Sequence, residues 1–349
     1  MSLLNKTKFL KNLIIGKVLN KNIPLTVILN VTDRCNLKCS YCYAAYYQRR
    51  KDEMSLDRIL KIIDELSGMG CKRISFGGGE PLLREDIGEM IKRVKEKKME
   101  CVINSNGYLV EREIDVLKNI DVLCLSLDGD EKAHDIYRGR GSFKEVMEAI
   151  ECASRYKIPL HTNTVLHRNN LNSIEFVLEV AKKYNLLAGF NLVIDYLSGE
   201  ENAAEYKNQD SEIKNALRRL IRYKKEGHNI LFSKKALEYT LLWPTYRIEA
   251  FFDDTPGFRH VTCSAGKYFC LVDTNGDVYP CPHLIGKIEP INAAREGFRK
   301  AFINLDKHNC RACYQVYHNE FNLLFSLDYS VIYNHIKNSF KISLFKEYH

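Results

Sequence analysis

The sequence predicts an α/β protein built on a parallel sheet with helices outside it. Two observations carry this prediction: short apolar runs alternate with amphipathic segments, and a polar motif follows each of the first four runs. Regular alternation of strands and helices implies right-handed crossovers and parallel strands. The expected strands are 26–31, 73–76, 101–104, 122–127, 160–166 and 189–194.

Helix-like segments fill the intervals between these runs. The first begins after Ser55, a residue type that often caps helices. Beyond the sixth strand a charged bridge contains two more expected helices, and Pro244 stops the second. The expected helices are 56–67, 85–97, 111–119, 143–156, 174–184, 213–225 and 234–243.

Length and composition describe a soluble globular protein with a larger and a smaller domain. The 349 residues are 45% hydrophobic and 28% charged, with a net charge of +8. Lysines lie beside acidic residues over most of the chain, which argues against a nucleic-acid surface. The sequence contains no apolar stretch of transmembrane length and no secretory signal, so we expect a cytoplasmic protein whose 12 cysteines are reduced.

The first two dozen residues differ from the rest because their lysines are opposed by no acid. Apolar residues at helical spacing lie between these lysines. The segment is therefore either a basic amphipathic helix at a membrane surface or a helix that closes the bottom of the main domain.

Cys35, Cys39 and Cys42 follow the first expected strand, with Tyr41 directly before the last of them. Three thiolates from one loop can converge on one soft metal centre. A structural zinc normally has four protein ligands, whereas an iron–sulfur cube held by three cysteines keeps one iron open. Buried apolar cysteines or zinc ligands are the alternative interpretation.

Three other polar motifs also fall at strand ends, at residues 77–81, 104–107 and 126–129. Ligands of parallel α/β proteins bind beyond the carboxyl ends of the strands. We therefore expect these motifs to share one site with the cysteine loop.

A second set of cysteines follows Pro256-Gly257. Within it, Asn275-Gly276 separates two apolar runs, 269–272 and 278–279, which predicts a β-hairpin. Cys270 lies in the middle of the first run and is expected to be a buried apolar residue.

The cysteine motif and the later Gly78-Gly79-Glu80-Pro81 resemble the radical S-adenosylmethionine (SAM) superfamily over about residues 26–195. The resemblance implies a partial (β/α)6 TIM-like barrel, open on one side. It also implies that Cys35, Cys39 and Cys42 hold a 4Fe–4S cluster whose open iron binds SAM.

The same resemblance assigns a second group of residues to SAM binding. For residues of this group, the alternatives to SAM binding are a role in a turn, a role as a helix cap or a position on the surface. The implied SAM-binding residues are Tyr41, Gly78, Gly79, Glu80, Asn104, Asn106, Ser126, Asp128, Arg138, Val165 and Asn191.

The C-terminal cysteines resemble the auxiliary-cluster domain of the SPASM/twitch subclass, in its shorter form. The resemblance implies that Cys263, Cys281, Cys310 and Cys313 hold a second 4Fe–4S cluster that relays electrons. Four thiolates would equally hold a zinc ion.

These features predict five regions: an N-terminal helix (1–24), the barrel core (25–197), a helical bridge (198–257), the auxiliary-cluster domain (258–325) and a C-terminal helix (326–349). The expected function is reductive SAM cleavage and hydrogen abstraction from a small-molecule or peptide substrate. A flavodoxin or ferredoxin is the expected electron donor, and Asp195 and Tyr196 are candidates for proton handling. The alternatives are a membrane-surface enzyme acting on a lipid or polyprenyl substrate, and a non-enzymatic zinc or iron–sulfur scaffold.

Overall fold

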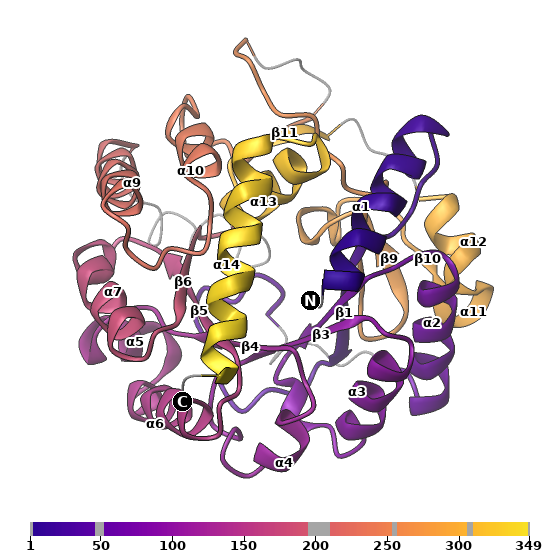
Figure 1. The fold of residues 1–349 in the computed structure, drawn as a ribbon, viewed down its shortest axis with the longest axis horizontal. Coiled ribbons are helices and arrows are strands. Elements are labelled where there is room, and N and C mark those ends of the chain that lie inside the picture. Colours follow the sequence, from indigo (N-terminus) through magenta and orange to yellow (C-terminus); the bar gives the residue numbers. More distant parts are fainter. Residues whose placement is uncertain (1–2, 46–51, 195–209, 253–256, 306–309, 348–349) are drawn as a thin grey trace.

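The computed structural model describes residues 3–45, 52–194, 210–252, 257–305 and 310–347. Nine strands form one sheet in the order β10-β9-β8-β1-β2-β3-β4-β5-β6 (Figure 1). All neighbouring pairs from β1 to β6 are parallel. Because β6 and β10 lie at opposite edges, the sheet is open, and the predicted α/β fold is confirmed.

The six predicted strands are all present, with ends shifted by one or two residues. Four predicted helices also match closely, whereas α4 is much shorter than predicted and α5 was not predicted. The strands are β1 (Thr26–Thr32), β2 (Arg73–Gly78), β3 (Glu100–Ser105), β4 (Val122–Ser126), β5 (Leu160–Leu166) and β6 (Leu187–Leu192). The helices are α2 (Leu56–Gly68), α3 (Ile87–Glu96), α4 (Ile114–Leu117), α5 (Glu131–Arg138), α6 (Ser142–Arg155) and α7 (Ile174–Lys183).

Each long helix packs on the sheet through residues three and four positions apart. In α2 the buried positions are Ile59, Ile62, Ile63 and Leu66. Ser55 is the N-cap residue of α2, but its side chain makes no capping hydrogen bond. Figure 1 shows α2 to α7 around the outside of the strands. Segments from the two ends of the chain lie on the opposite side of the sheet.

The predicted hairpin is formed by β8 (Phe269–Val272) and β9 (Asp277–Tyr279). It joins the main sheet, because β8 pairs in parallel with β1 and β10 (Ile291–Asn292) pairs with β9. The second cysteine group is thereby attached to the same strand that carries the first.

The remaining elements cover the open side and the edges of the sheet. Figure 1 shows α13 and α14 crossing in front of the strands, with α1 on the side of β9 and β10. Among the described residues, no helix is long and apolar enough to span a bilayer. These elements are α1 (Leu3–Val18), α9 (Asp210–Lys225), α10 (Lys234–Leu241), β7 (Ala250–Phe252), α11 (Ala293–Glu296), α12 (Phe298–Ile303), β11 (Cys310–Cys313), α13 (Val316–Phe325) and α14 (Tyr329–Glu347).

Candidate active site

The cysteine loop follows the carboxyl end of β1. Cys35, Cys39 and Cys42 are half-buried and line one cavity of about 790 Å³. The loop is tied to the end of α5, since Ser40 N donates to the Tyr137 carbonyl at 3.1 Å. Burial, together with the neighbouring Glu80, Cys39 and Cys42, raises the pKa of Cys35 to about 11. Cys35 is thus close to the other two thiols of the loop, and a bound cation would favour its thiolate form.

The cavity extends along the strands, on the side of the sheet that faces α13 and α14. One end is lined by the cysteines and by residues 77–79, which end β2 and begin the following turn. The other end is lined by Arg73 and Glu100, the first residues of β2 and β3, and by residues of α1 and α14. Its wall between the two ends includes Ser75, Val102, Asn104, Cys124, Ser126, Asn163 and Val165.

The glycine turn after β2 packs directly on the start of the cysteine loop. A Cβ atom on Gly78 would lie 2.4 Å from the carbonyl oxygen of Thr32, and one on Gly79 would lie 2.1 Å from that of Arg34. Gly79 N also donates to the Thr32 carbonyl at 2.7 Å. No side chain fits at either position, so the two glycines set the distance between the turn and the loop.

Glu80 is buried and holds the loops that follow β2 and β3 together. Its carboxylate accepts hydrogen bonds from Leu82 N at 3.1 Å and from Asn106 N at 2.8 Å. Burial raises the pKa of Glu80 to about 7. The side chain caps the short 3-10 helix Pro81–Leu83 and does not line the cavity.

Asp128 organises the wall of the cavity without reaching it. Its buried carboxylate accepts hydrogen bonds from the Tyr41 hydroxyl, from Arg138 Nε at 2.6 Å and from Val165 N at 2.9 Å. Burial would raise the pKa of Asp128, but Arg138 and His134 lower it below its ordinary value. Tyr41, Arg138 and Val165 line the cavity, so Asp128 fixes three lining residues at once.

The predicted asparagines all line the same cavity, as does Ser126. Asn104 donates to Ser75 Oγ at 2.9 Å, and Asn106 donates to Asn36 in the cysteine loop at 2.8 Å. Asn191 donates to Asn163 at 2.7 Å. Their amides thus link neighbouring strand ends. The predicted Asp195 and Tyr196 lie outside the described residues.

The second cysteine group assembles from three separate segments. Cys281 follows β9, Cys310 and Cys313 lie on β11, and Cys263 precedes β8. Burial raises the pKa of Cys310 to about 12, with a further contribution from Cys263. Burial also raises the pKa of Cys313, and the other three cysteines of the group add to that rise. All four sulfurs are therefore near one another.

Cys270 lies outside this group. It is buried within β8, and its pKa is raised by burial and by the neighbouring Cys71 of the main core. The structure thus places it as a packed apolar side chain, like Cys71 itself.

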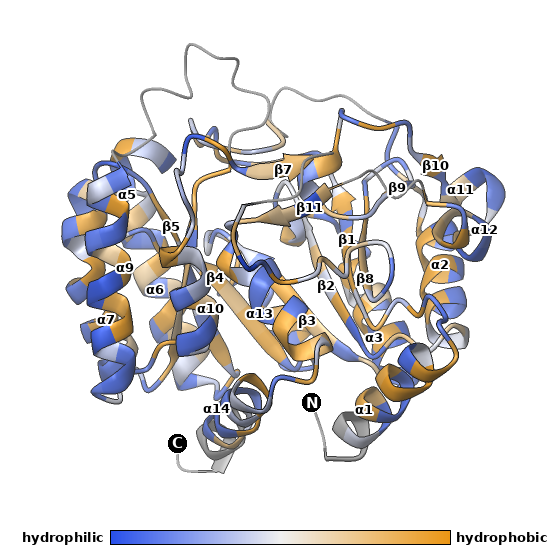
Figure 2. Ribbon diagram, turned by 90° about the horizontal axis from the view of Figure 1, so that it is seen from above, coloured by the Kyte–Doolittle hydropathy of each residue, from blue (hydrophilic) through white to orange (hydrophobic). Residues whose placement is uncertain are grey.

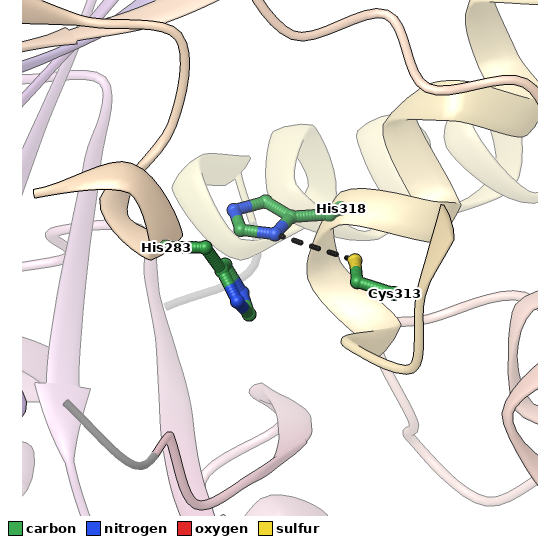
Figure 3. Close-up of side chains that lie close together, drawn as sticks. All are labelled: His283, Cys313 and His318. Atoms are coloured by element: carbon green, nitrogen blue, oxygen red, sulfur yellow. Dashed lines mark hydrogen bonds between the residues drawn. The ribbon is translucent and has the colours of Figure 1, made fainter. Parts of the chain in front are cut away.

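Two buried histidines beside the second group were missed in the sequence. His283, Cys313 and His318 offer ligand atoms that all lie within 4.8 Å of one another (Figure 3). His318 Nδ1 is 4.0 Å from Cys313 Sγ, and His283 Nδ1 is 3.0 Å from Glu249. Burial lowers the pKa of His318 to about 4. A signal for this mixed set of donors was present in the sequence, since each histidine follows a cysteine closely: His283 follows Cys281, and His318 follows Cys313.

The donors fit iron–sulfur clusters at both places. The first group has three sulfurs facing a cavity with room for a small molecule, which suits a cluster with one open iron. The second has four sulfurs outside the residues that line the cavity, with Cys281 and Cys313 buried and Cys263 and Cys310 half-buried, which suits a closed site. The histidines next to Cys313 keep a zinc ion as the alternative occupant there.

Part of this chain matches a known protein family. Residues 29–181 match the model of the radical SAM superfamily. The chain is 32% identical to Fe-coproporphyrin III synthase from Methanosarcina barkeri over 169 residues, which are 47% of this chain and 42% of that protein. It is 27% identical to AdoMet-dependent heme synthase from the same organism over 296 residues, 82% of this chain and 84% of that protein.

A third relative is PqqA peptide cyclase from Bradyrhizobium diazoefficiens, 29% identical over 166 residues, 46% of this chain and 43% of that protein. Among solved structures, SuiB of Streptococcus suis bound to S-adenosylmethionine aligns with a TM-score of 0.67 and 17% identity, over 86% of this chain and 70% of that one. The chain spans less than half of two of these three relatives. The family match begins inside β1 and contains both the cysteine loop and the glycine turn, so the part of the chain that matches the radical SAM superfamily carries the first candidate site.

Proposed function

We propose that this enzyme cleaves SAM reductively at the first cysteine group and uses the product radical to abstract hydrogen from a substrate carbon. Cys35, Cys39 and Cys42 would hold a 4Fe–4S cluster, which would supply the electron for the reductive cleavage of SAM to methionine and a 5′-deoxyadenosyl radical. The chain's own residues bind and orient SAM and the substrate and keep water away from them.

One observation carries this proposal: three cysteines from one loop face the same cavity as the glycine turn, and the other lining cysteine, Cys124, belongs to β4 and not to the loop. Arg138 reaches the cavity wall and is the proposed partner of the SAM carboxylate, since a guanidinium binds a carboxylate in a bidentate way. Tyr41 and Val165 are the proposed contacts of adenine. In this arrangement Asp128 is a positioning residue that holds Tyr41, Arg138 and Val165. Glu80 could accept a hydrogen bond from the SAM ammonium group only after its contacts with Leu82 N and Asn106 N rearrange.

The substrate class proposed first is a peptide or another small molecule. Two similar proteins are named for a peptide: PqqA peptide cyclase, and SuiB in its structure bound to the precursor peptide SuiA. Two others are named for a porphyrin or a heme. The second cysteine group is proposed to hold a 4Fe–4S cluster that passes electrons between the substrate and a flavodoxin or ferredoxin in the cytoplasm.

The test of this function is direct. Protein reconstituted with iron and sulfide without oxygen, then mixed with SAM and dithionite, is expected to form 5′-deoxyadenosine and methionine in equal amounts. Substrates deuterated at the reacting carbon should transfer deuterium into 5′-deoxyadenosine. Iron-loaded protein that forms none of this product would exclude the proposal.

Replacing Gly79 with alanine is expected to lower 5′-deoxyadenosine formation about a hundredfold or more, because small displacements of reacting groups have effects of that size. The new Cβ would lie 2.1 Å from the Arg34 carbonyl oxygen and 2.7 Å from its carbon, so the backbone leading to Cys35 must move. The measurement is the rate of 5′-deoxyadenosine formation together with the iron bound per chain.

Gly68→Ala is the matched control, since a Cβ at the end of α2 meets no atom within 4 Å. This variant is expected to retain full activity. Equal rates for the two variants would show that the tight contact at Gly79 does not position the cysteine loop.

A further inference from the structure

The outward faces of α1 and α14 carry large apolar side chains that are exposed. On α1 these are Leu10 (45% exposed), Ile14 (46%) and Val18 (76%), which follow one another at intervals of four residues. On α14, Tyr329 (84%), Tyr333 (67%), Ile336 and Phe340 (65%) follow the same helical spacing. Stripes of this kind on two helices exceed the scattered apolar residues of an ordinary surface.

The opposite faces of both helices are packed, so the stripes are not a consequence of loose helices. On α1, Leu13 is fully buried, and Phe9 stacks on Phe325 at the end of α13. On α14, Val331 is fully buried, and Asn338 donates to the Leu231 carbonyl at 2.7 Å. Each helix is therefore held in place while its apolar stripe faces outward.

The charge around these stripes is positive. The first acidic residue of the chain is Asp33, so α1 and the turn after it contain none. The lysines of α1 and this turn whose side chains are described are exposed, and Lys8 lies close enough to Lys72 to contribute to the lowered pKa of the Lys72 ammonium group. On α14, Lys337 is exposed between Tyr333 and Phe340. The exposed lysines of α1 and the turn are Lys8, Lys11, Lys17 and Lys21.

The two stripes frame one mouth of the cavity. Leu10 from α1 and Ile336 and Phe340 from α14 line the cavity and are also exposed. Figure 2 shows α1 and α14 on the same side of the molecule, with β7 and β11 on the opposite side. The cavity continues from this mouth past Val102 and Val122 to the cysteine loop.

We propose that the face formed by α1 and α14 docks on an anionic lipid membrane, with this mouth of the cavity against the bilayer. Apolar side chains interleaved with lysines on a helix that lies flat at an interface combine apolar burial with attraction to anionic headgroups. Both interpretations of the N-terminal segment then hold, because one side of α1 closes the bottom of the sheet and the other meets the lipid. One consequence rests on the proposed function: the enzyme takes a substrate whose apolar part enters from the bilayer between α1 and α14.

Co-sedimentation of the full-length, iron-loaded protein with vesicles tests the docking face. Phosphatidylcholine vesicles with roughly one third phosphatidylglycerol supply the negative surface, and pure phosphatidylcholine vesicles supply the comparison. Leu10→Ser with Ile14→Ser, and separately Tyr333→Ser with Phe340→Ser, should each weaken binding at least tenfold. Lys11→Gln with Lys17→Gln should weaken binding to the anionic vesicles, and added salt should do the same to the unmodified protein.

Leu242→Ser with Ile303→Ser is the matched control, because these side chains are 72% and 53% exposed but lie at the end of α10 and on α12. This variant should bind the vesicles as the unmodified protein does. Circular dichroism should show that each variant is folded. We expect this result because all the replaced side chains are exposed.

Equal recovery of all variants with anionic vesicles, or no recovery of the unmodified protein, would overturn the proposal. A dimer in sedimentation velocity that the Tyr333 and Phe340 substitutions dissociate, without vesicle binding, would show instead that a second copy covers this face. The vesicle assay contains no SAM. If the protein forms 5′-deoxyadenosine but does not bind vesicles, only the docking proposal is contradicted. If it binds vesicles but forms no 5′-deoxyadenosine, only the proposed function is contradicted.

Discussion

Replacing Cys39 with alanine is expected to abolish 5′-deoxyadenosine formation and to lower the iron bound from roughly eight to roughly four per chain, the content of one 4Fe–4S cluster. Cys39 is one of three sulfurs that the cysteine loop presents to the cavity, and the fourth cysteine that lines the cavity, Cys124, lies on β4 outside this loop. Cys39 lies beside Arg138 and Cys42 in the loop between β1 and α2. Two sulfurs cannot hold a cube in the geometry that leaves one iron open for SAM.

Two control variants separate this effect from general damage. Cys152→Ala removes a thiol buried in α6, away from both cysteine groups, and should change neither iron nor activity. Cys263→Ala should remove the other half of the iron and leave the first site loaded. If the unmodified protein holds one zinc and only four irons, the second group is a zinc site and the proposed electron relay fails. If Cys39→Ala retains product formation, the first site is not the place of SAM cleavage.

Much of the fold could be predicted because the parallel strands are buried on both faces and read as short apolar runs. In β1 six of seven residues are buried, and the neighbouring strand β2 has the same character. The helix α5 was missed because its eight residues are mostly polar. Its start was nevertheless marked, since the Asp130 side chain accepts from Ala133 N as an N-cap.

The attachment of the hairpin to the main sheet could not be predicted in the same way. Local pattern identifies β8 and β9 and the turn at Asn275-Gly276, but the partner of β8 is β1, more than 200 residues earlier. Pairing at that distance depends on tertiary packing, and the sequence of either strand allows several neighbours.

The buried polar side chains of α13 were a second omission. The sequence analysis assigned no role to them, yet Glu320 is buried and accepts hydrogen bonds from Ser233 N and Oγ, and His318 lies beside Cys313. A buried polar residue has no signature in the sequence until its partner is known. The role of Asp128 was hidden for the same reason, because only the structure brings Tyr41 and Arg138 to one carboxylate.

Replacing Arg73 with methionine is expected to lower the free energy of unfolding by about 3 kcal/mol near neutral pH. Arg73 and Glu100 begin neighbouring strands, and Arg73 Nη1 lies 3.4 Å from Glu100 Oε2 at the end of the cavity that α1 and α14 line. Burial would raise the pKa of Glu100, but Arg73, with smaller contributions from other positive groups such as His335, lowers the value to about 2. Methionine keeps much of the packing volume and leaves the buried carboxylate without this guanidinium. Urea unfolding followed by circular dichroism, at equal iron loading, measures the change.

The pH dependence of the stability loss in Arg73→Met distinguishes this electrostatic cause from a loss of packing. Because the pKa of Glu100 is depressed in the folded protein, its stabilising contribution is present above the ordinary pKa near 4.5 and is lost only as pH falls toward 2. In Arg73→Met the buried carboxyl group can take up a proton instead, so the deficit should shrink between pH 7 and pH 4. Arg73→Met with Glu100→Gln should recover most of the stability at pH 7. Arg93→Met, which breaks the exposed pair with Asp64, should cost no more than about 1 kcal/mol. A deficit that is the same at both pH values, and that the double variant does not reduce, would mean that Arg73 stabilises this end of the cavity by packing and not by its charge.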